Sequence, residues 1–128
     1  MSGKVLVMTA ERPARVGERI RAELMEMLLL GQLKDPGTQG AVVHAVKVTG
    51  DLRHAKVYVR LGQVDPPQRA KEGLMRGLER AKGFLRRQIG DRLGLRHAPE
   101  LTFLWDDTTD RAGRIDAILD EIAKQEEE

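Results

Sequence analysis

The sequence predicts a single α+β domain with the element order α, β, β, α, β, α. Apolar residues recur every three or four positions in two long segments, 12–30 and 68–93, as in amphipathic helices. Segments rich in β-branched residues or with alternating apolar positions lie at 41–49, 54–61 and 101–105, as in strands. The 128 residues are the length of one ordinary domain, which holds ~100 to 200 residues.

The first helix is predicted over 12–30. Its apolar stripe consists of Val16, Ile20, Leu24, Met27 and Leu28. Gly31 and then Asp35-Pro36-Gly37 end this segment, because glycine and proline interrupt helices.

Two strands are predicted to form an antiparallel hairpin. Segment 54–61 alternates, with one face made of Ala55, Val57, Val59 and Leu61 and the other of Lys56, Tyr58 and Arg60. The four residues 50–53 between the strands include Gly50 and Asp51, which favour a turn. One face of the hairpin should therefore be buried.

A second helix is predicted over 68–93, with the apolar stripe Leu74, Leu78, Ala81, Leu85 and Ile89. Pro99 closes a break, and a third strand follows at 101–105. A last helix is expected from about Asp110, with Ile115, Ile118 or Leu119, and Ile122 on one side. We expect a flexible segment over 1–11, the folded domain over 12–106, and a C-terminal helix with an acidic tail over 107–128.

The charge is unevenly distributed along the chain. Residues 106–128 carry nine acids and three bases, a net charge of −6, so the rest carries +8 of the total of +2. A basic body with an acidic tail often has a nucleic-acid partner, although a solvated basic surface is the alternative. The chain has no cysteine, hence no disulfide or thiolate site, and no apolar run that spans a membrane. We expect a cytoplasmic protein that does not contact membranes.

The second helix carries the most informative charged surface. Arg76, Arg80, Gly83 and Arg87 fall within about 60° on a helical wheel, opposite the apolar stripe. Guanidinium groups bind phosphates bidentately. The residues expected to contact RNA are Arg53, Arg76, Arg80, Lys82, Gly83, Arg86, Arg87, Arg92 and Arg96.

Gly83 lies in the middle of the predicted helix, where glycine costs about 1 kcal/mol relative to alanine. A kink is one explanation and close helix packing is the other. For a kink with positive φ or a second backbone against the glycine, Gly83→Ala should destabilise the fold.

Enzyme signatures are mostly missing from the sequence, and we expect no catalytic activity, metal or cofactor. Ser2 is the only serine, and neither a phosphate-binding glycine loop nor a dinucleotide fingerprint occurs. His44 and His54 could approach across the hairpin, but with His97 they lack metal-ligand spacing. Asp106, Asp107 and Asp110 could form the carboxylate cluster of a metal-dependent nuclease, or could cap a helix.

The sequence resembles ribosome-binding factor A over about residues 12–122. The most specific part is the run VKVTGDLRHAKVYV at 46–59, which is similar to the family's strand, Asp-Leu turn and following strand. Further matches are Arg15-Val16, Asp35-Pro36, and PELTF at 99–103 followed by Asp106 or Asp107. The chain departs from the family at Gly37, where arginine commonly follows Asp-Pro.

The resemblance implies a type II KH-like domain with a three-stranded sheet and an added C-terminal helix. It implies that a helix kink at Ala81, Lys82 and Gly83 replaces the usual Gly-x-x-Gly clamp, which grips single-stranded backbones. It also implies a ribosome biogenesis factor, monomeric off the ribosome, that binds the immature small (30S) subunit and its 16S rRNA near the 5′-terminal helix. Late subunit maturation, rRNA processing and cold adaptation are the processes implied. A general RNA-binding KH-type module and a metal-dependent nuclease are the alternatives.

Overall fold

Two long helices and three strands follow one another in the predicted order. The computed structural model describes residues 2–107, 119 and 122–123, with side chains from Arg12 onward. Its elements are α1 (Ser2–Leu29), the 3-10 helix η1 (Pro36–Thr38), β1 (Ala41–Val48), β2 (His54–Leu61), α2 (Gln68–Leu93) and β3 (Glu100–Trp105). The helix predicted from about Asp110 lies largely outside the described residues. Within the described part, no helix has the length and apolar character needed to cross a membrane.

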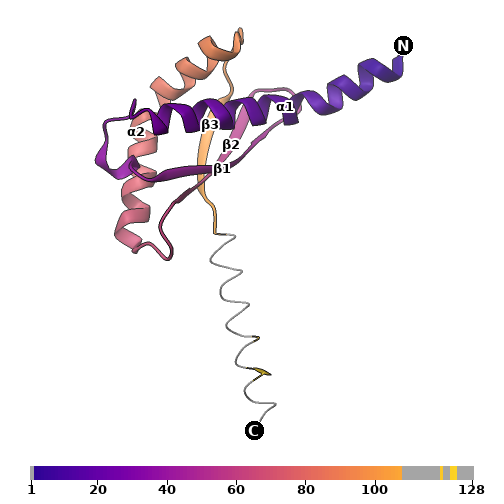
Figure 1. The fold of residues 1–128 in the computed structure, drawn as a ribbon. Helices are drawn as coiled ribbons and strands as arrows, with labels where there is room; N and C mark the ends of the chain where they lie inside the picture. Colours follow the sequence, from indigo (N-terminus) through magenta and orange to yellow (C-terminus); the bar gives the residue numbers. More distant parts are fainter. Residues whose placement is uncertain (1, 108–118, 120–121, 124–128) are drawn as a thin grey trace.

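The three strands form one mixed sheet in the order β1-β2-β3 (Figure 1). β1 and β2 are antiparallel, as the hairpin prediction requires, whereas β2 and β3 are parallel. Parallel neighbours need a crossover connection, which α2 supplies here. Because β3 returns beside β2, its first residue, Glu100, lies next to His54 at the turn end of the hairpin.

Both helices contribute to a single core on one face of the sheet. The alternating residues Ala55, Val57 and Val59 of β2 are fully buried, whereas Lys56 between them is exposed. The same cluster contains the predicted helical stripes and the inward side chains of β3, including Ile20, Leu24, Met27, Leu74, Leu78, Leu85, Ile89, Leu101 and Phe103. Burying such aliphatic side chains contributes roughly 1.5–3 kcal/mol each, so this face stabilises the domain.

Helix α1 begins at Ser2, ten residues before the predicted start near Arg12. Pro13 lies inside the helix, although a proline close to a helix start is usually its first residue. The predicted start followed the helical spacing of apolar residues, whose first member is Val16. Segment 1–11 is therefore helical from Ser2, and its flexibility stays a prediction.

The two hairpin histidines do not approach each other. The pairing of β1 with β2 shifts between Val43 and Ala45, so His44 sits at the irregularity, opposite the middle of β2. His54 lies at the turn end of the hairpin. Each histidine instead faces an acid: Nδ1 of His44 is 3.8 Å from Asp106 Oδ2, and Nδ1 of His54 is 3.7 Å from Glu100 Oε2. The possibility that His44 and His54 meet across the hairpin is therefore not realised.

Glycines allow two close backbone contacts that bring the helices onto the rest of the fold. A Cβ on Gly17 of α1 would lie 2.5 Å from the carbonyl oxygen of Val46 in β1. A Cβ on Gly37 of η1 would overlap the backbone carbonyl of Gly73 in α2. No arginine fits position 37 in this arrangement, which gives the departure from the family pattern a physical reason.

Helix α2 is continuous through Ala81, Lys82 and Gly83. Figure 1 shows the axis of α2 changing direction near its middle, where it passes behind α1. Gly83 does not have positive φ, and no atom lies within 4 Å of the position that its Cβ would take. The two grounds for expecting Gly83→Ala to destabilise the fold are therefore both absent. The assignment of a functional kink to these three residues stays a prediction.

Candidate nucleic-acid interface

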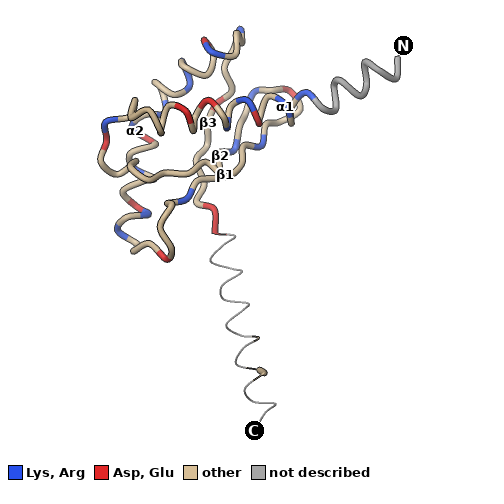
Figure 2. Tube along the Cα trace, in the orientation of Figure 1, with Lys and Arg blue, Asp and Glu red and all other residues tan. Residues whose placement is uncertain are grey.

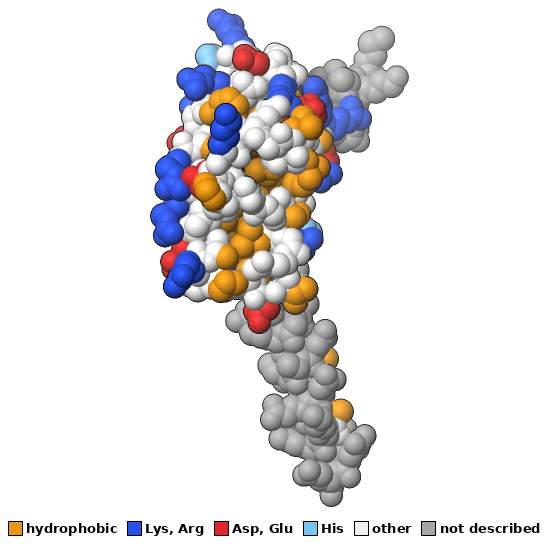
Figure 3. Space-filling view, turned by 60° about the vertical axis from the view of Figure 1, so that its left-hand side comes forward, with side chains coloured by type: hydrophobic (Ala, Val, Ile, Leu, Met, Phe, Trp, Pro, Cys, Tyr) orange, Lys and Arg blue, Asp and Glu red, His pale blue; other side chains and the backbone are white. Residues whose placement is uncertain are grey.

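The basic residues predicted on α2 divide into those with partners and those without. Figure 2 shows Lys and Arg along both helices, with Asp and Glu interspersed on α1. In the space-filling view, Lys and Arg side chains gather along one edge, beside a band of hydrophobic side chains (Figure 3). Which of these cations are available to a ligand depends on their local partners.

Arg80 is bound to the segment that follows α1. Its Nη2 and Nε lie 2.6 and 3.0 Å from Oδ2 of Asp35, which also begins η1 by accepting a hydrogen bond from the Gly37 N–H. The hydrogen bond from Arg80, and secondly that from Gly37, lower the pKa of the Asp35 carboxyl. The Arg80 side chain remains 62% exposed, so one side of it still faces solvent.

Arg92 connects the two helices. Its side chain is only 23% exposed and lies 2.9 Å from Glu23 of α1, with a further hydrogen bond of 3.2 Å to Gln32. A guanidinium held in this way stabilises helix packing, and its predicted RNA contact stays a prediction. Lys82 and Arg76 make weaker intrahelical pairs, at 3.0 Å to Glu79 and 4.0 Å to Glu72. Such exposed pairs contribute ~0.3–0.5 kcal/mol and are readily exchanged for another anion.

Three predicted residues have guanidinium groups with no hydrogen-bonded partner in the described part of the chain, although the charge of Arg53 interacts electrostatically with the nearby Asp51 carboxylate. Among the residues that the structure describes, the guanidinium groups of Arg53, Arg87 and Arg96 make no hydrogen bond or ion pair, and the same holds for Arg12. Arg53 and Arg96 come from segments far apart in the sequence: the hairpin turn and the connection from α2 to β3. The fold brings these two together.

They line one hollow of about 570 Å³ beside the turn end of the hairpin. Four arginines surround it, together with two histidines and two acids: Arg12, Arg53, Arg86, Arg96, His54, His97, Asp51 and Glu100. The charged groups sum to +2 with neutral histidines. We call this feature the arginine hollow.

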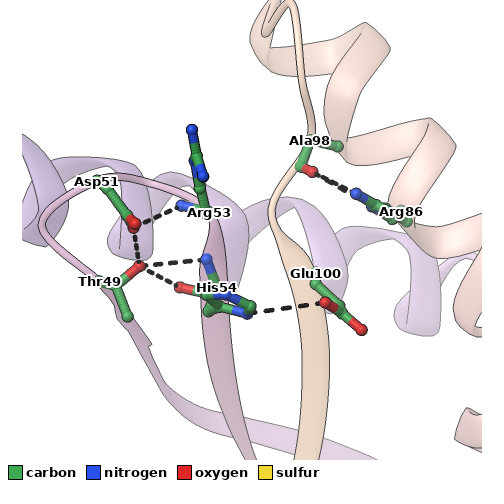
Figure 4. Close-up of polar contacts among 7 residues, drawn as sticks. All are labelled: Thr49, Asp51, Arg53, His54, Arg86, Ala98 and Glu100. Carbon is green, nitrogen blue, oxygen red and sulfur yellow. Dashed lines mark hydrogen bonds and ion pairs between the residues drawn. The ribbon is translucent and has the colours of Figure 1, made fainter.

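The hairpin turn fixes the start of β2 at the edge of the hollow (Figure 4). The Asp51 carboxylate accepts hydrogen bonds from the Thr49 hydroxyl at 2.6 Å and from the Arg53 N–H at 3.1 Å. These two bonds, that from Thr49 first, lower the pKa of Asp51. Leu52 has a left-handed φ of 61°, a conformation that costs a leucine of order 1 kcal/mol and persists only where its surroundings impose it. The turn is therefore defined by its side chains rather than by a glycine.

Arg86 faces the opposite side of the hollow and binds the backbone rather than an acid. Its Nε and Nη2 donate to the carbonyl oxygen of Ala98 at 3.2 and 3.1 Å (Figure 4). Arg86 was predicted as an RNA contact from its helix face. The RNA contact of Arg86 stays a prediction. In the structure, its guanidinium group binds the Ala98 carbonyl.

The acids proposed for a metal cluster occupy different environments. Asp106 is buried, follows β3 directly and donates its backbone N–H to Val59 at 2.8 Å. Asp107 lines a separate shallow hollow with Trp105 and Met75. Asp110 lies outside the described residues. In the part of the chain that the structure describes, no three His, Asp or Glu side chains gather closely enough to hold a metal ion.

Sequence reasoning missed Arg12 and the partner of Arg80. In the sequence, Arg12 was only the expected start of the first helix, because its proximity to the hairpin turn depends on how α1 crosses the sheet. Asp35 was recognised as a helix-ending residue in Asp-Pro, and no sequence signal joined it to a residue 45 positions away.

The element order, the mixed three-stranded sheet and the two helices on one of its faces define a KH-like α+β domain. The class is supported by two solved structures. A crystal structure of ribosome-binding factor A from Thermus thermophilus superposes with a TM-score of 0.58 and 28% identity, covering 72% of this chain and 93% of that one. A solution structure of a Thermotoga maritima protein assigned to the same factor gives 0.61 and 34% identity, covering 74% and 87%.

The chain belongs to the ribosome-binding factor A family. That family matches residues 12–119. Ribosome-binding factor A of Gloeobacter violaceus is 43% identical over 122 residues, which cover 94% of this chain and 92% of that protein. The corresponding protein of Halothermothrix orenii is 35% identical over 120 residues, covering 94% and 95%. The resemblance carried by 46–59 and the flanking motifs is thereby confirmed.

Proposed function

We propose that this chain is a cytoplasmic assembly factor that binds the immature small ribosomal subunit and promotes its late maturation without catalysing a reaction. Membership of the ribosome-binding factor A family supports ribosome binding. For the Thermus thermophilus protein of this family, a homology model has been fitted into the electron-microscopy map of its complex with the 30S subunit. We also propose that the chain contacts 16S rRNA near the 5′-terminal helix, takes part in rRNA processing and contributes to growth in the cold.

The observation that carries the proposal is the group of guanidiniums without a hydrogen bond or ion pair to the described residues, Arg53, Arg87 and Arg96, on a body of net charge +8. Phosphate contacts supply most of the affinity of nucleic-acid-binding proteins, and guanidinium groups match phosphate geometry. Occupying one arrangement of a folding RNA stabilises it relative to competitors, because a ligand shifts an equilibrium by its differential affinity for the two states. No bond-making step is required.

Sedimentation with separated ribosomal particles tests the proposal. The tagged full-length chain should travel with free, immature small subunits and leave them when Arg53 and Arg96 are both changed to glutamine. Arg21→Gln is the matched control, since Arg21 is an exposed arginine on α1 that pairs with Glu18 at 2.9 Å. Wild-type protein that stays at the top of the gradient would contradict the proposal.

Two further readouts separate the alternatives. A general RNA-binding module would bind unrelated RNA as tightly as small-subunit RNA. A metal-dependent nuclease would cut RNA with magnesium and lose this activity in the Asp106→Asn, Asp107→Asn double variant, which removes charge while nearly keeping shape. We expect RNA to remain intact with both proteins.

A further inference from the structure

We propose that the arginine hollow holds one phosphate group of an RNA backbone, with Arg12, Arg53 and Arg96 as its ligands and Arg86 as a positioning residue. This inference rests on the proposed function and adds to it a location, a ligand class and a division of roles among the arginines. It also provides a phosphate site on a KH-like fold that does not depend on a Gly-x-x-Gly loop.

The charges of the hollow favour an anion with several acceptor oxygens. Three guanidinium groups from three separate segments line it without a hydrogen bond or ion pair to the described residues, and that of Arg53 interacts at longer range with the Asp51 carboxylate. The two acids that line it have their own hydrogen-bonded or ionic partners: Asp51 accepts hydrogen bonds from Thr49 and the Arg53 N–H, beside its weaker electrostatic interaction with the Arg53 charge, and Glu100 faces His54 at 3.7 Å. The two non-bridging oxygens of a backbone phosphodiester each accept more than one hydrogen bond, so one phosphate can bind several guanidinium groups, whose planar shape matches phosphate geometry.

The surroundings favour a phosphodiester chain over a free phosphate. A second hollow of about 400 Å³ adjoins the first and shares with it Arg86, Leu95, Arg96, His97 and Ala98. Arg87 lines this second hollow but not the first. Arg96 therefore lies between two recesses that each present a free guanidinium. A backbone running from the first recess to the second would bring a neighbouring phosphate towards Arg87.

The segment that carries Arg96 is held at both ends, so the ligands have a defined separation. Towards its C-terminal end, Arg86 of α2 donates two hydrogen bonds to the Ala98 carbonyl. Just beyond it, the Glu100 N–H donates to the Arg53 carbonyl at 2.8 Å, which joins the segment directly to the hairpin turn. The start of the segment is fixed at the end of α2 by the bond from the Leu95 N–H to Gly90, at 2.9 Å. Arg86 thus acts through Ala98 on the placement of Arg96.

A scan of single neutral phosphates tests the ligand assignment. Small-subunit RNA fragments, each with one methylphosphonate, are titrated with wild-type chain and with the Arg53→Gln, Arg96→Gln double variant. We expect one position at which neutralisation weakens wild-type binding about tenfold, the size of losing a charge-assisted contact, and leaves the double variant unaffected. Such non-additivity between the neutral phosphate and the arginine substitutions identifies groups that are in contact. If the losses caused by the neutral phosphate and by the double variant add at every position, the assignment is wrong, and the arginines attract the RNA only through their overall charge.

Arg86 is tested by lysine substitution, with Arg21 of α1 as the matched control position. Arg86→Lys keeps the charge but not the two-pronged hydrogen bond, so binding should weaken about as much as in Arg86→Ala, with altered amide shifts at 96–98. Arg21→Lys should bind nearly as the wild type, with those shifts unchanged, because Arg21 pairs with Glu18 on α1 and lines neither hollow. If Arg86→Lys binds like the wild type, Arg86 does not position the segment. If the wild-type chain fails to bind small subunits at all, the proposed function fails instead.

Discussion

Asp35 and Arg80, separated by 45 positions in the sequence, form a hydrogen-bonded ion pair with Nη2 of Arg80 2.6 Å from Oδ2 of Asp35. The pair ties the segment after α1 to the outer side of α2. Beneath it, Gly37 contacts the backbone of Gly73, so a side-chain link and a backbone contact fix the same joint. The predicted RNA-binding face of α2 is therefore also a structural face.

The ion pair predicts a specific dependence of stability on pH. Arg80 and the Gly37 N–H lower the pKa of Asp35 in the folded state. A lowered folded-state pKa gives stability that is present above the unfolded-state value of about 4 and is lost as pH falls through the folded-state value. Asp35→Asn should therefore reduce the free energy of unfolding at pH 7. The difference from the wild type should shrink in acid, as measured by urea denaturation at both pH values.

The pKa of Asp51 is lowered as well, first by the hydrogen bond from Thr49 and then by that from the Arg53 N–H. The control for the Asp35 experiment is therefore Asp51→Asn, which should show a similar pH trend without altering the joint of η1 with α2. If the stability loss in Asp35→Asn is the same at pH 7 and in acid, the ion pair is not its cause.

Arg80 and Arg87 should separate the structural from the binding role of α2. We expect Arg87→Ala to leave the melting temperature nearly unchanged and to lower the slope of log affinity against log salt by about 1, the loss of one phosphate contact. Arg80→Ala should lower both the slope and the melting temperature, because it also leaves Asp35 without its guanidinium. Unchanged slopes in both variants would mean that this face is only a solvated surface.

The helices and strands could be predicted because their patterns are local. The stripe from Leu74 to Ile89 and the alternation from Ala55 to Val59 each reflect burial on one face, and the structure buries both. The parallel position of β3 was not predicted from any pattern, since it depends on how the crossover helix returns. The start of α1 was also missed, because the helix was predicted from the apolar stripe that begins at Val16, whereas α1 extends back through Pro13 to Ser2.

The site was only partly predictable, since charge is visible in a sequence but partners are not. Helical spacing placed Arg80 and Arg87 on one face, yet one is bound to Asp35 and the other is free. Arg12, Arg53 and Arg96 belong to three segments with no shared pattern, and only the packing of α1 and the return of the chain after α2 bring them to one hollow.

Close packing at Gly37 predicts a destabilising substitution specific to this chain. A methyl group there would meet the Gly73 carbonyl of α2, which is backbone and cannot rotate away. Gly37→Ala should therefore lower the free energy of unfolding by about 1–3 kcal/mol, as overpacking commonly does. Gly50→Ala is the control, because no atom lies within 4 Å of its Cβ position. Equal stability of the two variants in urea would contradict this packing.

Gly83 and Gly17 should respond to alanine in opposite directions, although both lie inside helices. Gly83 has ordinary helical φ and open space at its Cβ position, so Gly83→Ala should raise the free energy of unfolding by about 0.5–1 kcal/mol through helix propensity alone. Gly17→Ala has the same propensity gain but places a methyl 2.5 Å from the Val46 carbonyl oxygen, and should destabilise the fold. Urea denaturation of the two variants measures both effects.

The same Gly83 variant tests whether the bend of α2 matters for binding. A methyl at this exposed position meets no protein atom, so any loss of binding must come from a changed helix path or from a backbone of the RNA that approaches the glycine closely. We expect Gly83→Ala to be more stable and to bind small subunits less tightly in a pelleting assay, with Arg21→Ala as the surface control. A stabilised variant that pellets with subunits as fully as the wild type would remove Gly83 from the interface and leave it as an ordinary helical glycine.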